Sequence, residues 1–164
     1  QRQRVGIARA LILQPEYILA DEPVSMIDAS SRTEILYLMR DLQERMGISF
    51  LYITHDIATA RYFSDRIAVM YLGRVVEQGG AGEVLDEPLH PYTKALIAAV
   101  PEADPNNRLH DRPSVPGETP SPANVPTGCN FHPRCPFAMD RCSVEEPVMK
   151  DMGSNHLLSC HLYE

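Results

Sequence analysis

The sequence predicts an α/β fold, because two strand-like segments flank one amphipathic helix. Residues 17–20 form a short apolar run between Pro15 and Pro23, which is typical of a strand inside a parallel sheet. Residues 32–46 carry apolar side chains at helical spacing, and residues 48–54 are rich in strand-forming types. Strand, helix and strand in this order form a βαβ unit, so we expect two parallel strands.

Other elements follow from local signals. Apolar spacing predicts a helix with one apolar face over residues 2–13. Ser31 and Glu34 have the spacing of a capping box, and Gly47 is a natural helix stop. After the second strand we expect a short helix at 57–63. We then expect a hairpin in which residues 67–71 and 74–77 flank a turn at Leu72 and Gly73. Residues 83–86 and 92–100 are expected to form a broken helical pair.

Composition limits the class of protein. With 164 residues, 44% apolar and 23% charged, the chain is the size of one domain or part of a larger one. No apolar stretch approaches the ~20 residues that span a bilayer. The net charge of −7 disfavours a nucleic-acid partner. The chain opens at Gln1 without a methionine, so we expect a piece of a longer protein with further motifs upstream.

Polar residues follow both expected strands. Asp21 and Glu22 end the first strand, and His55 follows the second. Because parallel strands end at the same edge of a sheet, these side chains should emerge together. A magnesium-nucleotide site needs a carboxylate near the metal, a group that positions water and a polar group near the γ-phosphate. The competing interpretation is that the acids are merely solvated and that the histidine only makes structural hydrogen bonds.

Four segments in order resemble the second half of an ATP-binding-cassette ATPase, whose sheet is of the RecA-like P-loop NTPase type. Residues 1–11 are similar to the helix after that family's signature motif, which Gln1 would end. Residues 17–23 resemble the Walker B strand, residues 25–28 the D-loop, and His55 the switch histidine. Several motifs at family-like separations are a more specific signal than any one of them.

The resemblance assigns a role to each of these residues. It implies that Asp21 helps to hold the magnesium of Mg-ATP through water. It implies that Glu22 is the catalytic base or orients the water, and that His55 senses the γ-phosphate. Asp28 of the D-loop would take part in communication across an ATPase dimer.

Several parts of an ATPase are missing from the sequence. It contains no Gly-x4-Gly-Lys-Ser/Thr loop, Q-loop or adenine-stacking aromatic, and it lacks the front of the signature motif. The backbone N–H groups and the lysine of that loop supply most of the grip on a nucleotide. We therefore expect this chain alone neither to bind ATP tightly nor to hydrolyse it.

The cysteines of the chain lie near its end, in a C-x5-C-x6-C-x17-C pattern: Cys129, Cys135, Cys142 and Cys160. In a cytosolic protein such clusters favour metal binding over disulfides. Four thiolates could hold an iron–sulfur cluster or tetrahedral zinc, and the same cysteines could instead form disulfides or stay as free thiols. His132 or His161 could replace a cysteine at zinc, but hydrogen bonding is the simpler interpretation of both.

The resemblance then narrows to one group of transporters. Residues 90–93, 117–122 and 128–136 look like the C-terminal extension of oligopeptide and dipeptide importer ATPases. That family carries a 4Fe-4S cluster on such cysteines, so the resemblance implies a cluster here, with zinc as the alternative. A structural staple is the conservative hypothesis for its role, and a redox sensor is the sharper one.

The expected fold is therefore the C-terminal half of a P-loop NTPase sheet with flanking helices and a hairpin, followed by a proline-rich, loop-dominated metal-binding extension. The expected divisions are the ATPase half at 1–80, a helical connector at 81–100, a proline-rich linker at 101–128 and the four-cysteine extension at 129–164.

The leading functional hypothesis is the ATPase subunit of a peptide importer, peripheral at the cytoplasmic face of the membrane. Its partners would be a second ATPase subunit, two transmembrane permeases and, indirectly, an external peptide-binding protein. One competing hypothesis is a metal-bound regulatory or dimerisation module without activity. A third is a soluble cassette ATPase of DNA repair or translation, although the acidic charge disfavours that class.

Overall fold

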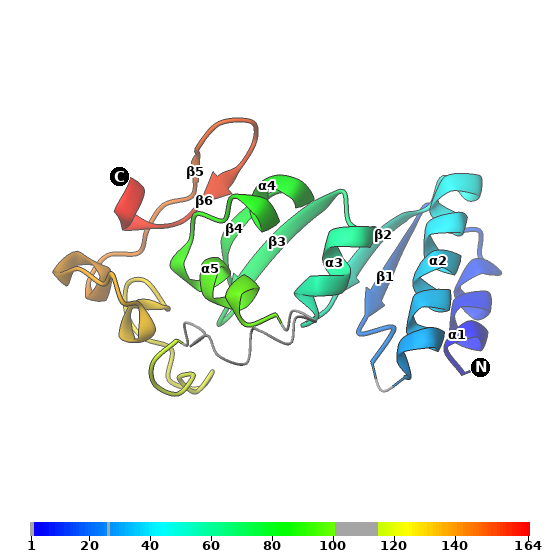
Figure 1. Cartoon of the computed structure of the whole chain (residues 1–164), viewed down its shortest axis with the longest axis horizontal. Coiled ribbons are helices and arrows are strands. Elements are labelled where there is room, and N and C mark those ends of the chain that lie inside the picture. Colours follow the sequence, from blue (N-terminus) through cyan, green and yellow to red (C-terminus); the bar gives the residue numbers. More distant parts are fainter. Residues whose placement is uncertain (1, 26, 101–114) are drawn as a thin grey trace, which may run out of the picture. The chain divides into compact units, whose positions relative to one another are not determined.

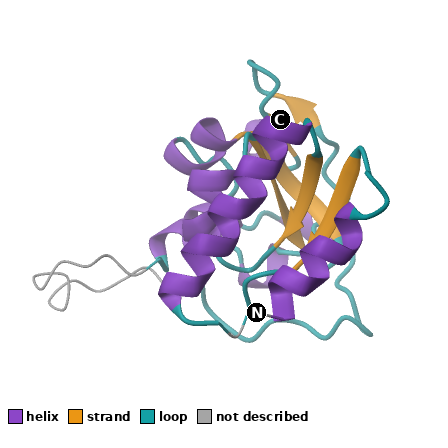
Figure 2. Cartoon of the chain, turned by 90° about the vertical axis from the view of Figure 1, so that its right-hand side faces the viewer, coloured by secondary structure: helices purple, strands orange, loops and turns teal. Residues whose placement is uncertain are grey.

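A computed structural model describes residues 2–25, 27–100 and 115–164 of the chain (Figure 1). The chain divides into two compact units, Gln1–Asp56 and Ile57–Glu164. One parallel and one antiparallel sheet occur together with helices, shown in orange and purple in Figure 2, so the mixed α/β class is confirmed. Among the described residues, no helix has the length and apolar character needed to cross a membrane.

The first unit is the expected βαβ arrangement preceded by a helix. Its elements are α1 (Arg2–Leu11), β1 (Tyr17–Asp21), α2 (Ala29–Met46) and β2 (Ser49–Ile53). β1 and β2 pair in parallel, in a register that runs from Tyr17 opposite Ser49 to Asp21 opposite Ile53. The prediction of two parallel strands joined by a helix is therefore confirmed, and both strands end at the same edge.

The ends of α2 are fixed by two local signals. Asp28 is the N-cap, and its side chain accepts a hydrogen bond from the backbone N–H of Ser31 at 2.9 Å. The expected capping box at Ser31 is wrong. The helix begins at Ala29, with Asp28 as its N-cap, so Ser31 lies inside the first turn. Gly47 ends the helix with a φ of 68°, as predicted.

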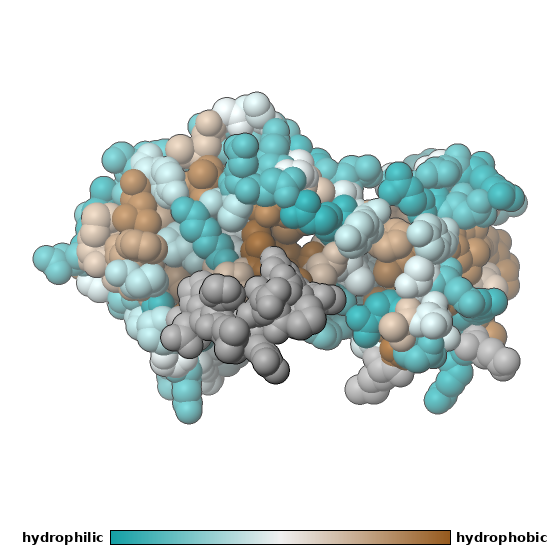
Figure 3. Space-filling view, viewed as in Figure 1, coloured by the Kyte–Doolittle hydropathy of each residue, from teal (hydrophilic) through white to brown (hydrophobic). Residues whose placement is uncertain are grey.

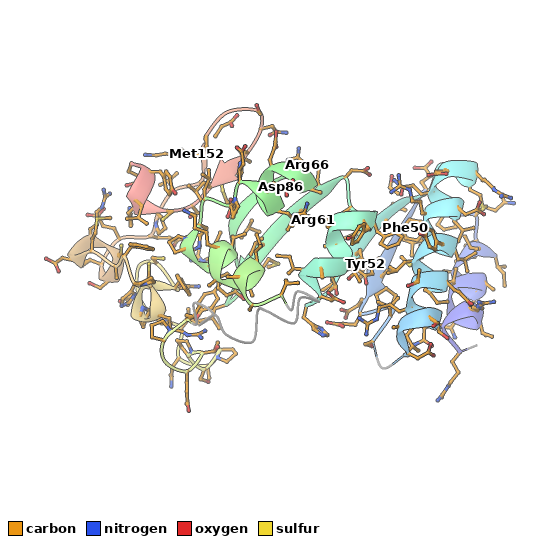
Figure 4. The ribbon with its side chains drawn as sticks, in the orientation of Figure 1. Phe50, Tyr52, Arg61, Arg66, Asp86 and Met152 are labelled. Carbon is orange, nitrogen blue, oxygen red and sulfur yellow. The ribbon has the colours of Figure 1, made fainter. Side chains whose placement is uncertain are left out.

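The two-stranded sheet has one exposed apolar face. Tyr17, Leu19 and Leu51 lie on that face and are 76%, 60% and 61% exposed. Phe50 and Tyr52 project from the opposite face of β2, where they are half-buried (Figure 4). The expectation of a buried first strand is thus wrong within the first unit, because none of the described residues of that unit covers the Leu19 face. Apolar surface, in brown, is visible over this unit at the right of Figure 3.

The second unit is built on a hairpin to which the end of the chain adds two short strands. The hairpin pairs β3 (Arg66–Tyr71) with β4 (Arg74–Gly80), and the sheet order is β3-β4-β6-β5 with β5 (Lys150–Asp151) and β6 (Leu157–Leu158), all antiparallel. Leu72 and Gly73 have φ values of 43° and 79°. Positive φ at both positions is what a two-residue hairpin turn of type I′ requires, so the predicted hairpin is confirmed.

Helices cover and extend this hairpin. They are α3 (Ile57–Phe63), α4 (Ala81–Asp86) and α5 (Pro91–Ala98), followed by the 3-10 turns η2 (His132–Arg134), η3 (Asp140–Ser143) and η4 (His161–Tyr163). α4 packs on β4, and Arg61 of α3 pairs with Asp86 of α4 at 2.6 Å (Figure 4). Residues 87–90 separate α4 from α5, so the expected broken helical pair is present, and the imidazole of His90 caps α5 by accepting the N–H of Tyr92.

The hairpin and the cysteine-rich tail share one apolar core. Its buried members are Val69, Tyr71, Val76, Val84 and Phe131. The rings of Tyr71 and Phe131 meet edge-on, with their centroids 5.2 Å apart. The tail is loop-dominated, as predicted, because its described residues form only 3-10 turns and two-residue strands. Residues 101–114, half of the expected proline-rich linker, lie outside the described residues.

Candidate functional site

The turn after β1 holds the two adjacent acids in different ways. Asp21 ends the strand with an exposed side chain. Glu22 has a φ of 47°, in the left-handed region that is uncommon for a residue with a side chain. Its N–H donates to the carbonyl of Ile53 at 3.0 Å, and its own carbonyl accepts bonds from the N–H and hydroxyl of Ser25. The backbone of Glu22 is therefore fixed by β2 and by the turn that follows.

The structure brings Glu22 and His55 together. Oε1 of Glu22 lies 2.7 Å from Nδ1 of His55, although the residues are 33 positions apart in the chain. This hydrogen bond and the negative charge of Glu22 raise the pKa of His55 above its ordinary value. The His55 side chain is 80% exposed, so the imidazole is open to a ligand. Geometrically, the pair can hold and transfer a proton at the edge of the sheet.

Asp28 and Gln1 complete the residues expected at this site. The carboxylate of Asp28 accepts the Ser31 N–H at the start of α2, and this bond lowers the pKa of Asp28. Asp28 is therefore ionised at neutral pH and oriented by the helix it caps. Gln1 lies outside the described residues, as does Met26 of the D-loop-like segment.

An ion pair beside His55 was not foreseen from the sequence. Nη1 of Arg32, in the first turn of α2, lies 2.9 Å from Oδ2 of Asp56. The backbone N–H of Asp56 also donates to Oγ1 of Thr54, so both the backbone and the side chain of Asp56 are hydrogen-bonded. Asp56 follows His55 directly in the sequence, but no local pattern predicts which cation it meets.

The four cysteines lie in one region of the second unit. All have free thiols; Cys142 is buried and the other three are half-buried. The N–H of Cys129 donates to the carbonyl of Cys142 at 2.8 Å. Burial raises the pKa of the Cys160 thiol to about 11, and the charges of the other three thiols add to the shift. The pKa values of Cys129 and Cys135 are also raised, mainly by burial.

These thiols do not form a metal site as placed. Four soft sulfur donors suit an iron–sulfur cluster or zinc in chemical type. Yet among the described residues no group of three or more histidine, cysteine, aspartate or glutamate side chains is arranged to hold a metal ion. The metal-binding part of the expected extension is therefore not shown. His132 contacts the Cys129 carbonyl at 3.0 Å, and His161 contacts Glu164 at 2.9 Å, so both make hydrogen bonds to oxygen.

A buried carboxylate was also missed. Glu77 of β4 is fully buried and accepts the backbone N–H groups of Leu89 at 2.8 Å and His90 at 3.0 Å. Nε2 of His156, from the loop before β6, lies 2.8 Å from the same carboxylate. Burial lowers the pKa of His90 to about 4, so its imidazole is neutral. Glu77 thus connects the hairpin to the start of α5 and to the tail. The sequence did not predict this cluster, because Glu77 and its partners lie far apart in the chain.

One comparison with known proteins concerns part of the second unit. Residues 76–142 match a family described as the oligopeptide/dipeptide transporter, C-terminal region. These residues are similar to that C-terminal region. The resemblance of the sequence to peptide-importer ATPases is thereby confirmed.

Curated relatives extend the likeness to the first unit. The chain is 48% identical over 164 residues to the oligopeptide transport ATP-binding protein AppF of Bacillus subtilis, covering 99% of this chain and 50% of that protein. It is 46% identical over 160 residues to a putative peptide import ATP-binding protein of Brucella ovis, covering 98% and 50%. It is 49% identical over 162 residues to a probable peptide ABC transporter ATP-binding protein of Sinorhizobium fredii, covering 99% and 46%. The chain spans about half the length of the curated relatives it matches.

Proposed function

We propose that this chain is part of the ATP-binding and hydrolysing subunit of a peptide importer, in which ATP hydrolysis drives uptake. The observation that carries the proposal is the 2.7 Å contact between Glu22 and His55 at the ends of two parallel strands. Relatives named as peptide-transport ATP-binding proteins support the same activity. The sequence has no Gly-x4-Gly-Lys-Ser/Thr loop, so the activity belongs to a subunit that supplies one.

The acids divide the chemistry between them. Magnesium, when bound with ATP, neutralises negative charge on the phosphates. Asp21, exposed at the end of β1, would hold it through water. Glu22 would orient the attacking water or take its proton, since its backbone is fixed on both sides of the turn.

His55 would contribute positive charge near the γ-phosphate. The hydrogen bond to Glu22 raises the pKa of His55, so more of the imidazole is protonated at neutral pH than in a free histidine. A protonated ring beside the transferred phosphoryl group stabilises its negative oxygens. Asp28 would act at the dimer contact from its fixed place at the start of α2.

The test uses the complete subunit, reconstituted with its partners in vesicles. We expect peptide-stimulated ATP hydrolysis, and a loss of at least about 100-fold in kcat for Glu22→Gln, because the amide cannot accept the proton. Glu44→Gln is the matched control, since Glu44 is an exposed acid paired with its helix neighbour Arg40. Full activity of Glu22→Gln, or a wild type without ATPase activity, would contradict the proposal.

The proposed partners are a second ATP-binding subunit and two transmembrane permeases, with an external peptide-binding protein reached through them. The proposed location is the cytoplasmic face of the membrane, and no nucleic acid is involved. Relatives named as peptide import proteins support this assembly. Co-purification with two permeases would separate this function from that of a cytosolic cassette ATPase.

We also propose that the four cysteines bind a 4Fe-4S cluster, with zinc as the alternative. The support is the chemistry of the donors: four free thiols, one buried and three half-buried, lie in one region of the second unit, and sulfur is a ligand that both metals take. Anaerobically purified protein should contain iron and sulfide in equal amounts and absorb visible light, and Cys142→Ser should remove both. Colourless protein with one zinc per chain would favour zinc, and protein without metal would overturn both assignments.

A further inference from the structure

The loop that carries His55 is held by its neighbours. The imidazole is 80% exposed, so packing does little to fix it. On one side Thr54 accepts the N–H of Asp56 at 2.9 Å, which closes a turn around His55. On the other side Nη1 of Arg32 donates a hydrogen bond to the carboxylate of Asp56.

Arg32 is itself tied to the start of α2. Its backbone N–H donates to the carbonyl of Asp28 at 2.9 Å, one turn earlier in the chain. The side chains of Arg32 and Asp56 are 37% and 26% exposed, so water screens the pair only in part. Nε of Arg32 is buried and has no hydrogen-bond partner among the described residues. Asp56 is the acidic partner of this guanidinium.

We propose that Arg32 and Asp56 are positioning residues, which hold the His55 loop against the start of α2 so that His55 meets Glu22 in the reactive geometry. This inference rests on the proposed ATPase function and deepens it. A covalent and hydrogen-bonded path runs from Asp28 through Arg32 and Asp56 to His55. A partner subunit that moves the Asp28 turn would therefore also move His55.

The expected effect is on the chemical step rather than on nucleotide binding. In the complete subunit, Arg32→Gln should lower kcat about tenfold or more and leave the KM for ATP within about twofold, because small misplacements act on the transition state. Asp56→Asn should have an effect of similar size. The double variant should be little worse than either single one, because both remove the same contact. Arg32→Lys keeps the charge without the planar fork and should recover part of the rate.

A matched control lies on the same helix. Arg40 pairs with Glu44 at 3.0 Å, with both side chains at least half exposed, so Arg40→Gln should keep the wild-type kcat. Thermal unfolding of each variant separates positioning from lost folding. If Arg32→Gln prevents folding, Asp56→Asn and Arg32→Lys carry the same test.

The outcomes can be told apart. A kcat of Arg32→Gln equal to that of Arg40→Gln, in a wild type that hydrolyses ATP, overturns the positioning role and leaves the proposed function standing. Independent, additive losses in the double variant also overturn it. A wild type without ATP hydrolysis overturns both proposals. Loss of kcat at unchanged KM, with partial recovery in Arg32→Lys, supports the positioning role.

Discussion

Replacing Glu77 with glutamine tests the buried cluster that joins the hairpin to the tail. Oε1 of Glu77 faces the N–H of Leu89 and Nε2 of His156, and Oε2 faces the N–H of His90. A glutamine has one carbonyl oxygen and one NH2 group in these two places. Whichever way the amide turns, its NH2 meets a backbone N–H, and at least one buried donor loses its acceptor.

The size of the effect follows from these contacts. A buried donor left without a partner costs about 1–3 kcal/mol, and the remaining bonds lose the extra strength that a charged acceptor gives. Because Glu77 is fully buried, water cannot replace the lost bonds. We therefore expect Glu77→Gln to lower the free energy of unfolding by about 2–5 kcal/mol, a large part of the stability of an ordinary domain.

Urea denaturation measures this loss, and hydrogen exchange locates it. Exchange of the Leu89 and His90 amides should accelerate more than that of amides elsewhere in the unit. Glu87→Gln is the matched control, because Glu87 is an exposed acid close by in the chain and its loss should cost under about 0.5 kcal/mol. If Glu77→Gln were as stable as this control, the argument from buried hydrogen bonds would be refuted.

Three further predictions concern single side chains. The folded-state pKa of His90 is about 4, below the ordinary value of about 6.5, so the unfolded chain takes up a proton at a higher pH than the folded protein does. The free energy of unfolding should therefore fall by up to about 3 kcal/mol as the pH drops from about 6.5 to 4. Urea titrations at several pH values measure this dependence, and His90→Asn should remove it. The imidazole of His55 should titrate above its ordinary value by NMR, and Glu22→Gln should bring the midpoint down. Gly128→Ala would place a Cβ against the backbone carbonyl oxygen of Cys142 and 2.9 Å from the carbonyl carbon of Ser143, whereas Gly117→Ala meets nothing within 4 Å. The φ angles are +67° and +73° at the two sites. Both substitutions should cost about 1 kcal/mol of strain, and Gly128→Ala at least about 2 kcal/mol more in thermal or urea unfolding; equal losses would contradict the clash.

Local sequence patterns predicted much of the backbone. Local residue patterns were enough to predict the βαβ order, the helix end at Gly47 and the Leu72-Gly73 turn, because each depends on residues close together in the sequence. The start of α2 was misplaced because Asp28 and Ser31 are both good caps, and only the fold decides between them. β5 and β6 were missed because two residues each carry no periodic signal.

The site was predicted in its residue types and less in its contacts. Glu22 and His55 were expected at one edge because parallel strands end together, and the structure joins them. The Arg32–Asp56 pair and the Glu77–His156 contact depend on which distant segments meet, and no local pattern encodes that choice. The cysteines show the same limit: the sequence identifies sulfur donors, but their arrangement depends on how the loops between them fold.

The pairing of β6 with β4 has a consequence for association between molecules. Leu158 lies opposite Glu77 and Leu157 opposite Gln78, so the end of the chain occupies the side of β4 away from β3. Without residues 150–158, the part of β4 around Glu77 and Gln78 would lie at an edge with unpaired N–H and C=O groups. Such an edge is a template for strand addition by another chain. Limited proteolysis within residues 150–158 should therefore produce aggregating protein. In the intact chain these residues would protect the edge of β4 against self-association.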